Sequence, residues 1–136
     1  MVDGSSVGAI DPGYLLLVCV MAGDTEEDAR VLSSKIVNLR LWPGEGGKIN
    51  DRSLLDIGGD VLVVSQFTLA ADLSHGNRPD YTGAAPRELA VSLCDKLVDF
   101  LKHEGVQNVQ TGQFGAKMDV ALVNDGPVTI LLERQG

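Results

Sequence analysis

Polar side chains follow one of the most apolar stretches of the sequence, where they are costly unless they are hydrogen-bonded or used. Ser65, Gln66 and Thr68 lie at the end of the apolar run 61–64, within Ser65-Gln66-Phe67-Thr68-Leu69. Two roles are open. The side chains could bond the neighbouring backbone, or the backbone N–H groups at the strand's end could stabilise an oxyanion in a pocket that handles an ester or amide.

A second stretch, Asn124-Asp125-Gly126-Pro127-Val128-Thr129, lies between the apolar runs 120–123 and 128–132. Gly126 has access to backbone angles that other residues reach only at a cost, and Pro127 fixes φ and lacks an N–H group. Held between two core strands, this Gly-Pro step would present carbonyl oxygens at a fixed position. An ordinary hairpin turn explains the same residues, so the stretch alone does not define a chemistry.

Other chemistries lack the residue patterns that they need. His75 and His103 belong to different elements, and no cysteine pair has the spacing of metal ligands, so we expect no metal and no cofactor. The glycine-rich segment 43–48 has no Ser or Thr after Lys48, which disfavours a phosphate-binding loop and favours a hairpin loop.

Length and composition indicate an ordinary globular protein with a single domain over residues 1–136. The net charge of −8 argues against broad, nonspecific binding of nucleic acid, although a local basic patch beside a small site is compatible with it. No apolar run is long enough to span a bilayer, and the start lacks the features of a signal peptide. Two cysteines do not make a disulfide framework, which predicts a reducing, cytoplasmic location.

The elements that must position the two stretches follow from hydrophobic periodicity and turn residues. We expect helices over 25–39 and 86–104, and a long polar loop over 70–85. Strands are expected over 14–20, 39–42, 53–57, 60–67, 106–111, 117–123 and 128–133, with Gly58-Gly59 forming a hairpin turn between the third and fourth. This order predicts an α/β layered domain with a mixed, largely antiparallel sheet and two main helices.

Together the two stretches resemble the paired signatures of the D-aminoacyl-tRNA deacylases, also called D-tyrosyl-tRNA deacylases. Further matches are the segment 112–118 and the loop from Arg78-Pro79 to Ala84-Ala85-Pro86, and the similarity runs from about Val2 to Leu132. The resemblance implies the fold of that family and a homodimer whose active site crosses between subunits. It also implies hydrolysis of the ester that joins a D-amino acid to the terminal adenosine of tRNA.

The resemblance further assigns roles to residues of both stretches. Gly126 and Pro127 would form a cis-peptide gate that reaches into the partner's pocket, rejects L-amino acids and admits glycine. The backbone N–H groups of Phe67 and Thr68 would form the oxyanion site, with the ribose 2′-hydroxyl helping to activate water. The remaining implied site residues are Ser65, Gln66 in the pocket's hydrogen-bond network, Phe114 and Met118 near the adenine, and Val128 and Thr129 in substrate binding.

Alternatives remain open at this point. Phe114 and Met118 fit simple core packing equally well, and Thr68 could be a nucleophile, although no base is visible near it in the sequence. A module that binds the tRNA acceptor end without hydrolysis would share the fold and pocket, and a generic Ser/Thr hydrolase would use Ser65 or Thr68. Family members usually begin with an additional strand that carries basic residues, and we expect that strand to be missing here.

Overall fold

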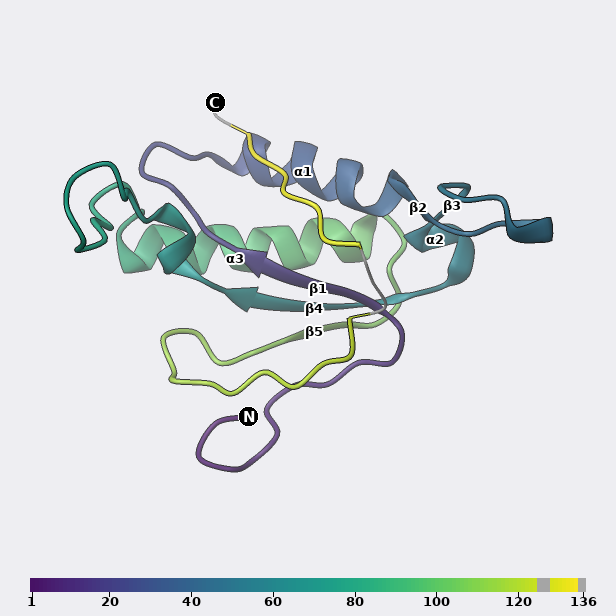
Figure 1. Ribbon diagram of the computed structural model, residues 1–136, viewed down its shortest axis with the longest axis horizontal. Helices are drawn as coiled ribbons and strands as arrows, with labels where there is room; N and C mark the ends of the chain where they lie inside the picture. The colour runs from purple at the N-terminus through teal and green to yellow at the C-terminus, as the bar shows by residue number, and fades with distance from the viewer. Residues whose placement is uncertain (125–127, 135–136) are drawn as a thin grey trace.

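The apolar runs near residues 14 and 60 form neighbouring parallel strands in the computed structural model (Figure 1), which describes residues 1–124 and 128–134. Strand β1 (Gly13–Val18) lies beside β4 (Asp60–Ser65), and β5 (Val109–Thr111) pairs with the other side of β4. All of these pairings are parallel, and Val18 lies opposite Ser65. The carboxyl ends of β1 and β4 therefore meet at one edge of the sheet.

Two long helices make the crossovers between the parallel strands, as their apolar periodicity predicts. Helix α1 (Glu26–Asn38) connects the β1 side to the segment before β4, and α3 (Arg87–His103) connects β4 to β5. The strand order β1-β4-β5 proceeds in one direction, so right-handed crossovers place both helices on the same face of the sheet, where they pack against each other. The core between the helices and the sheet contains Val37, Leu54, Val61 and Leu101, all fully buried.

The segment predicted as a strand over 53–57 is mostly a short helix. Strand β2 (Arg40–Trp42) pairs antiparallel with β3 (Arg52–Ser53), and the 3₁₀ turn η1 (Glu45–Gly47) lies in the loop between them. Helix α2 (Leu54–Ile57) follows, because Ser53 and Asp56 form a reciprocal capping box that satisfies the first free N–H groups. Gly58 ends this helix at a φ of 64°, so Gly58-Gly59 closes a helix and not a hairpin.

The layered α/β class and its two main helices are confirmed, but the direction of strand pairing differs from the expectation. Within the described ranges, antiparallel pairing is limited to β2 with β3 and to three isolated bridges. The described parts of the expected strands 117–123 and 128–133 have no assigned strand. Their side chains are largely exposed, Val123 at 96% and Leu131 at 75%, so these segments lack the burial and the partner strand that stabilise a sheet.

The segment 128–134 is nevertheless attached to the domain, and it runs beside α1 in Figure 1. Leu132 packs against the main core, and the Arg134 Nε donates a hydrogen bond of 2.9 Å to Asp28 Oδ1 on α1. No helix in the described part of the chain is long and apolar enough to cross a membrane.

Candidate functional site

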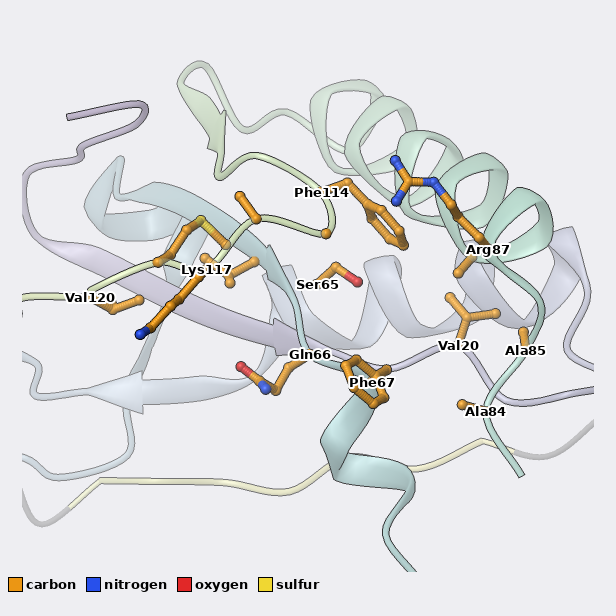
Figure 2. A pocket seen from close by; sticks show the side chains of 15 residues that line it. Val20, Ser65, Gln66, Phe67, Ala84, Ala85, Arg87, Phe114, Lys117 and Val120 are labelled. Atoms are coloured by element: carbon orange, nitrogen blue, oxygen red, sulfur yellow. The ribbon is translucent and has the colours of Figure 1, made fainter. Parts of the chain in front are cut away.

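A cavity of about 520 Å³ opens beside the carboxyl ends of β1 and β4 (Figure 2). Ligands of parallel α/β sheets characteristically bind at this edge, because the strands end there and the following segments diverge. The walls come from four segments that are far apart in the sequence: Val20 after β1, residues 64–67 at the end of β4, residues 84–90 at the start of α3, and residues 114–120.

Short backbone contacts bring the first three walls together. The Gln66 N–H donates a hydrogen bond of 2.7 Å to the Val18 carbonyl, which extends the parallel ladder one residue past β4. The polar loop 70–85 returns to the same edge, where the Ala85 N–H donates to the Val20 carbonyl at 2.9 Å. An isolated antiparallel bridge between Met21 and Ala84 secures this return. The loop therefore closes one side of the cavity and delivers the start of α3 to it.

The predicted residues Ser65, Gln66 and Phe67 all line this cavity, but Thr68 does not. The chain turns away after Gln66 into the 3₁₀ helix η2 (Phe67–Ala70). The Gln66 Nε2 donates a hydrogen bond of 2.6 Å to Thr68 Oγ1, so the two side chains satisfy each other across the start of η2. The expected alternative had these side chains bond the neighbouring backbone, whereas this pair bonds side chain to side chain.

The backbone N–H groups of Phe67 and Thr68, unlike the Thr68 hydroxyl, have no hydrogen-bond partner among the described residues. They are the first two N–H groups of η2, a position where no intrahelical acceptor is available. Neither donates a hydrogen bond to any of the described residues. The Phe67 N–H belongs to a residue that lines the cavity and the Thr68 N–H to the next residue, and both are available to an acceptor from outside the chain.

Ser65 faces a second group, the buried thiol of Cys94 on α3. Burial raises the pKa of the Cys94 thiol, and a hydrogen bond with the Ser65 side chain partly offsets that increase. Ser65 also borders a smaller cavity of about 80 Å³ together with Cys94. Its hydroxyl therefore lies between helix and sheet, and it forms no hydrogen bond with a His, Asp or Glu of the described residues that would make it a nucleophile.

Phe114 and Met118, predicted to lie near the adenine of the tRNA, both reach the cavity from the segment after β5. The Met118 sulfur lies over Gly112, where an added Cβ would come within 2.8 Å of it. The Arg87 guanidinium carbon lies 5.2 Å from the centroid of the Phe114 ring, at cation–π distance. Gly115, at a φ of +75°, passes directly beside this guanidinium. Packing thus holds an aromatic ring and a thioether at one wall.

Two cationic lining residues, Arg87 and Lys117, were not predicted as site residues. Lys117 lies within a matched motif, and Arg87 directly follows another, but neither motif indicates which side chains face a common cavity. The sequence gives only an indirect indication of these two residues. Because the chain has 19 Asp and Glu residues and only 11 Lys and Arg residues, each cation is a candidate for binding an anionic ligand.

Phe67 forms the outer edge of the cavity. The residue is 58% exposed, and its ring packs edge-to-face on Tyr81, with 5.3 Å between the ring centroids. The Cys19 thiol lies behind η2, 3.7 Å from the Phe67 carbonyl oxygen, and burial raises its pKa. The loop 70–85 and the end of β1 therefore both support the position of η2.

The remaining predicted site residues belong to the stretch 126–129. Gly126 and Pro127 lie outside the described residues. Val128 is 44% exposed and does not line the cavity, and Thr129 Oγ1 accepts a hydrogen bond of 3.4 Å from Asn124 Nδ2. Within residues 1–124 and 128–134, no three His, Cys, Asp or Glu side chains are grouped so that they could hold a metal ion.

Comparisons with known proteins find similar sequences and structures over nearly the whole chain. A D-aminoacyl-tRNA deacylase of Jannaschia sp. (strain CCS1) is 58% identical over 132 residues, covering 97% of this chain and 88% of the relative. Its namesake from Roseiflexus castenholzii is 54% identical, covering 97% of this chain and 83% of the relative.

Among solved structures, the c-Myc DNA unwinding element binding protein superimposes with a TM-score of 0.92 at 36% identity, over 100% of this chain and 91% of its own. A probable eukaryotic D-amino acid tRNA deacylase, at 16% identity and a TM-score of 0.75 over 87% of this chain and 83% of its own, shares the fold. The family model described as D-Tyr-tRNA(Tyr) deacylase matches residues 1–133, and the chain therefore belongs to that family.

Proposed function

We propose that this protein hydrolyses the ester bond of D-aminoacyl-tRNA, releasing the free D-amino acid and the tRNA. Membership of the family, with relatives of that name at 58% and 54% identity, supports the reaction. The observation that carries the proposal is the cavity where Gln66 and Phe67 meet Phe114 and Met118. It combines free backbone donors for an ester with an aromatic and thioether wall for a base. The single domain 1–136 would act in the cytoplasm, where aminoacyl-tRNA is used.

In the proposed mechanism, main-chain N–H groups polarise the ester carbonyl. The two free N–H groups of η2, on Phe67 and Thr68, would bind the ester carbonyl oxygen and stabilise the negative charge that develops on it. Gln66 would keep the start of η2 in place through its hydrogen bond to Thr68. A fixed pair of donors is effective because it need not reorganise during the reaction.

The attacking group is water, activated by the 2′-hydroxyl of the terminal ribose. The water oxygen bonds to the carbonyl carbon, the bond from that carbon to the ribose 3′-oxygen breaks, and the leaving oxygen takes up a proton. This chemistry needs only water, the RNA hydroxyl and main-chain N–H groups, so it calls for no cofactor.

A generic Ser/Thr hydrolase fits the site less well. The nearest partner of the Thr68 hydroxyl is an amide N–H, which donates a proton and cannot remove one. Ser65 bonds a thiol whose pKa burial has raised, so this thiol stays protonated at neutral pH and cannot take up the proton of Ser65. An ester-type covalent probe distinguishes the two mechanisms: we expect it to leave Ser65 and Thr68 unlabelled, and stoichiometric labelling of either would favour the hydrolase.

The wall formed by Phe114 and Met118 is suited to the terminal adenine. Proteins commonly bind unstacked RNA bases on aromatic faces, and the thioether is a soft, adaptable contact for a π system. Both side chains are partly exposed toward the cavity, which a purely structural core role does not require.

Stereochemical selection is assigned to Gly126 and Pro127, with Val128 and Thr129 as adjoining substrate-binding residues. A rigid pair of carbonyl oxygens would crowd the side chain of an L-amino acid while leaving room for the hydrogen of a D-amino acid. Glycine has no side chain to clash, so glycyl-tRNA should also be hydrolysed. Parallel assays with D-, L- and glycyl-tRNA test this selection: equal rates for D and L would exclude the gate.

A homodimer would place the gate of one subunit in the cavity of the other. The segments that flank the gate expose large apolar side chains, including Leu122 at 58%, Val123 at 96% and Ile130 at 54%. Exposed apolar surface of this kind commonly marks an interface, and a second copy is the occupant that the shared site requires. Mixing a strongly impaired Phe67→Pro chain with a strongly impaired Gly126→Trp chain should raise the activity well above that of either chain alone, because mixed dimers would contain one intact site, and no recovery would contradict a shared site.

The direct test of the proposed reaction is loss of the ester from D-aminoacyl-tRNA. The purified protein should accelerate hydrolysis far above the buffer rate. A protein that binds the charged tRNA but leaves the buffer rate unchanged would be a binding module.

A further inference from the structure

We propose that Arg87 and Lys117 are phosphate-binding residues that hold the RNA backbone next to the terminal nucleotide. This inference rests on the proposed function, because it concerns how the same cavity captures its substrate. It concerns the polyanionic part of the substrate, which the oxyanion site and the adenine wall do not contact.

The charge of the cavity wall is opposite to that of the molecule. The chain has a net charge of −8, yet the described residues that line the cavity include two cations and no carboxylate. Association with a polyanion is therefore unfavourable at most of the surface. Screening limits each charge to a range of about 8 Å at physiological salt, so cations at the cavity act locally on what enters it.

Both side chains are available to a ligand. Arg87 and Lys117 are exposed, and neither forms an ion pair with a carboxylate of the described residues. In contrast, Arg30, Arg40, Lys48 and Arg134 are each paired with an aspartate or glutamate. The two cations at the cavity thus differ from those that neutralise the protein's own carboxylates.

Their positions fit a strand that enters the cavity. Figure 2 shows Arg87 and Lys117 on opposite sides of the opening, with Phe114 and Ser65 between them. The Arg87 guanidinium lies over the Phe114 ring at 5.2 Å from its centroid. Stacking restrains the guanidinium plane but leaves its N–H groups free at the rim, in the geometry that suits phosphate oxygens. A base against Phe114 therefore brings its 5′-phosphate within reach of this rim.

The test compares two substrates that differ in the phosphate. Arg87→Gln and Lys117→Gln should each lower kcat/KM for D-aminoacyl-tRNA by about tenfold, mainly through KM. Both variants should hydrolyse D-aminoacyl-adenosine, which has no phosphate, at the wild-type rate. Lys102→Gln is the matched control, because this exposed lysine lies on the same helix, about 22 Å from Arg87 at about 1.5 Å per residue. It should leave both reactions unchanged.

Equal losses on both substrates would overturn the proposal, since Arg87 would then act by positioning Phe114. Unchanged kinetics on charged tRNA would overturn it as well. Salt titration gives a second readout: each variant should flatten the plot of log affinity for uncharged tRNA against log salt by about 0.7.

Binding of uncharged tRNA does not depend on hydrolysis, so it separates the two proposals. A wild-type protein that binds tRNA with this salt dependence but releases no amino acid would refute the deacylase function alone. An identical salt slope in wild type and both variants would refute the phosphate contacts alone.

Discussion

Thr68 offers a sharp test of whether the main chain or a side chain does the chemistry. Its hydroxyl makes one hydrogen bond, at 2.6 Å, with the Gln66 amide. A neutral hydrogen bond contributes about 1 kcal/mol, and about 1.4 kcal/mol corresponds to a tenfold change in rate. Thr68→Ala leaves the backbone N–H in place, so it should slow single-turnover hydrolysis of D-aminoacyl-tRNA by less than about tenfold.

A nucleophilic Thr68 predicts a very different result. Removal of the attacking hydroxyl would lower the single-turnover rate by about a thousandfold or more. Single-turnover conditions are needed because slow product release could hide a change in the chemical step. A loss of that size in a Thr68→Ala protein that folds normally would refute the main-chain mechanism.

A complementary pair of variants removes the backbone donor itself. Phe67 is the first residue of η2, where proline is tolerated because its missing N–H has no intrahelical acceptor. Phe67→Pro should therefore fold, but it loses one of the two proposed oxyanion donors, a change that typically costs 10²–10³ in rate. Phe67→Ala loses the same ring and keeps the N–H, so the ratio of the two rates isolates the donor. Equal rates would show that this N–H does not contact the ester.

Three further predictions concern the fold. Leu101→Ala should destabilise the protein by about 2–5 kcal/mol in urea unfolding, because Leu101 is fully buried and its removal leaves a cavity; a change below about 1 kcal/mol would contradict the described core. Hydrogen bonds from Thr25, together with Arg134, lower the pKa of Asp28, so this group stabilises the protein above its unfolded pKa of about 4, and the contribution is lost as the pH falls through the lower folded value. Asp28→Asn should weaken that acid dependence in thermal melts, and an unchanged profile would contradict it. Burial raises the pKa of Tyr14 to about 12, and its hydroxyl has no partner among the described residues. Tyr14→Phe should therefore be neutral or stabilising, and it should remove stability loss between about pH 10 and pH 12, where the unfolded chain ionises first; strong destabilisation at neutral pH would reveal a partner for the hydroxyl.

Much of the scaffold could be predicted because its signals are local and repeated. The helices α1 and α3 were expected almost within their observed bounds, since their apolar residues recur over several turns. Strands β1 and β4 were also expected, from runs of aliphatic residues between turn signals. Their parallel pairing was not expected. The Gly58-Gly59 step resembles a hairpin turn, which joins antiparallel strands, when the Ser53–Asp56 capping box before it is overlooked.

The site was predictable to the extent that it lies on one segment. Ser65, Gln66 and Phe67 reach the cavity because they directly follow β4, and Phe114 and Met118 were found through a motif. Arg87 was missed because its place depends on the return of the loop 70–85 to the end of β1, which hydrogen bonds between distant residues determine. The exposed segments near Val123 and Leu131 show the same limit, since a strand there needs a partner that local sequence does not specify.

A single comparison of substrates tests both the hydrolysis of D-aminoacyl-tRNA and the selection by chirality that we propose for this protein. The same tRNA is charged with the D and with the L form of one amino acid, and each is mixed with excess protein while ester loss is followed. We expect rapid release of the D-amino acid and release of the L-amino acid at the buffer rate. Ester loss at the buffer rate for both forms, or at equal accelerated rates, would contradict it.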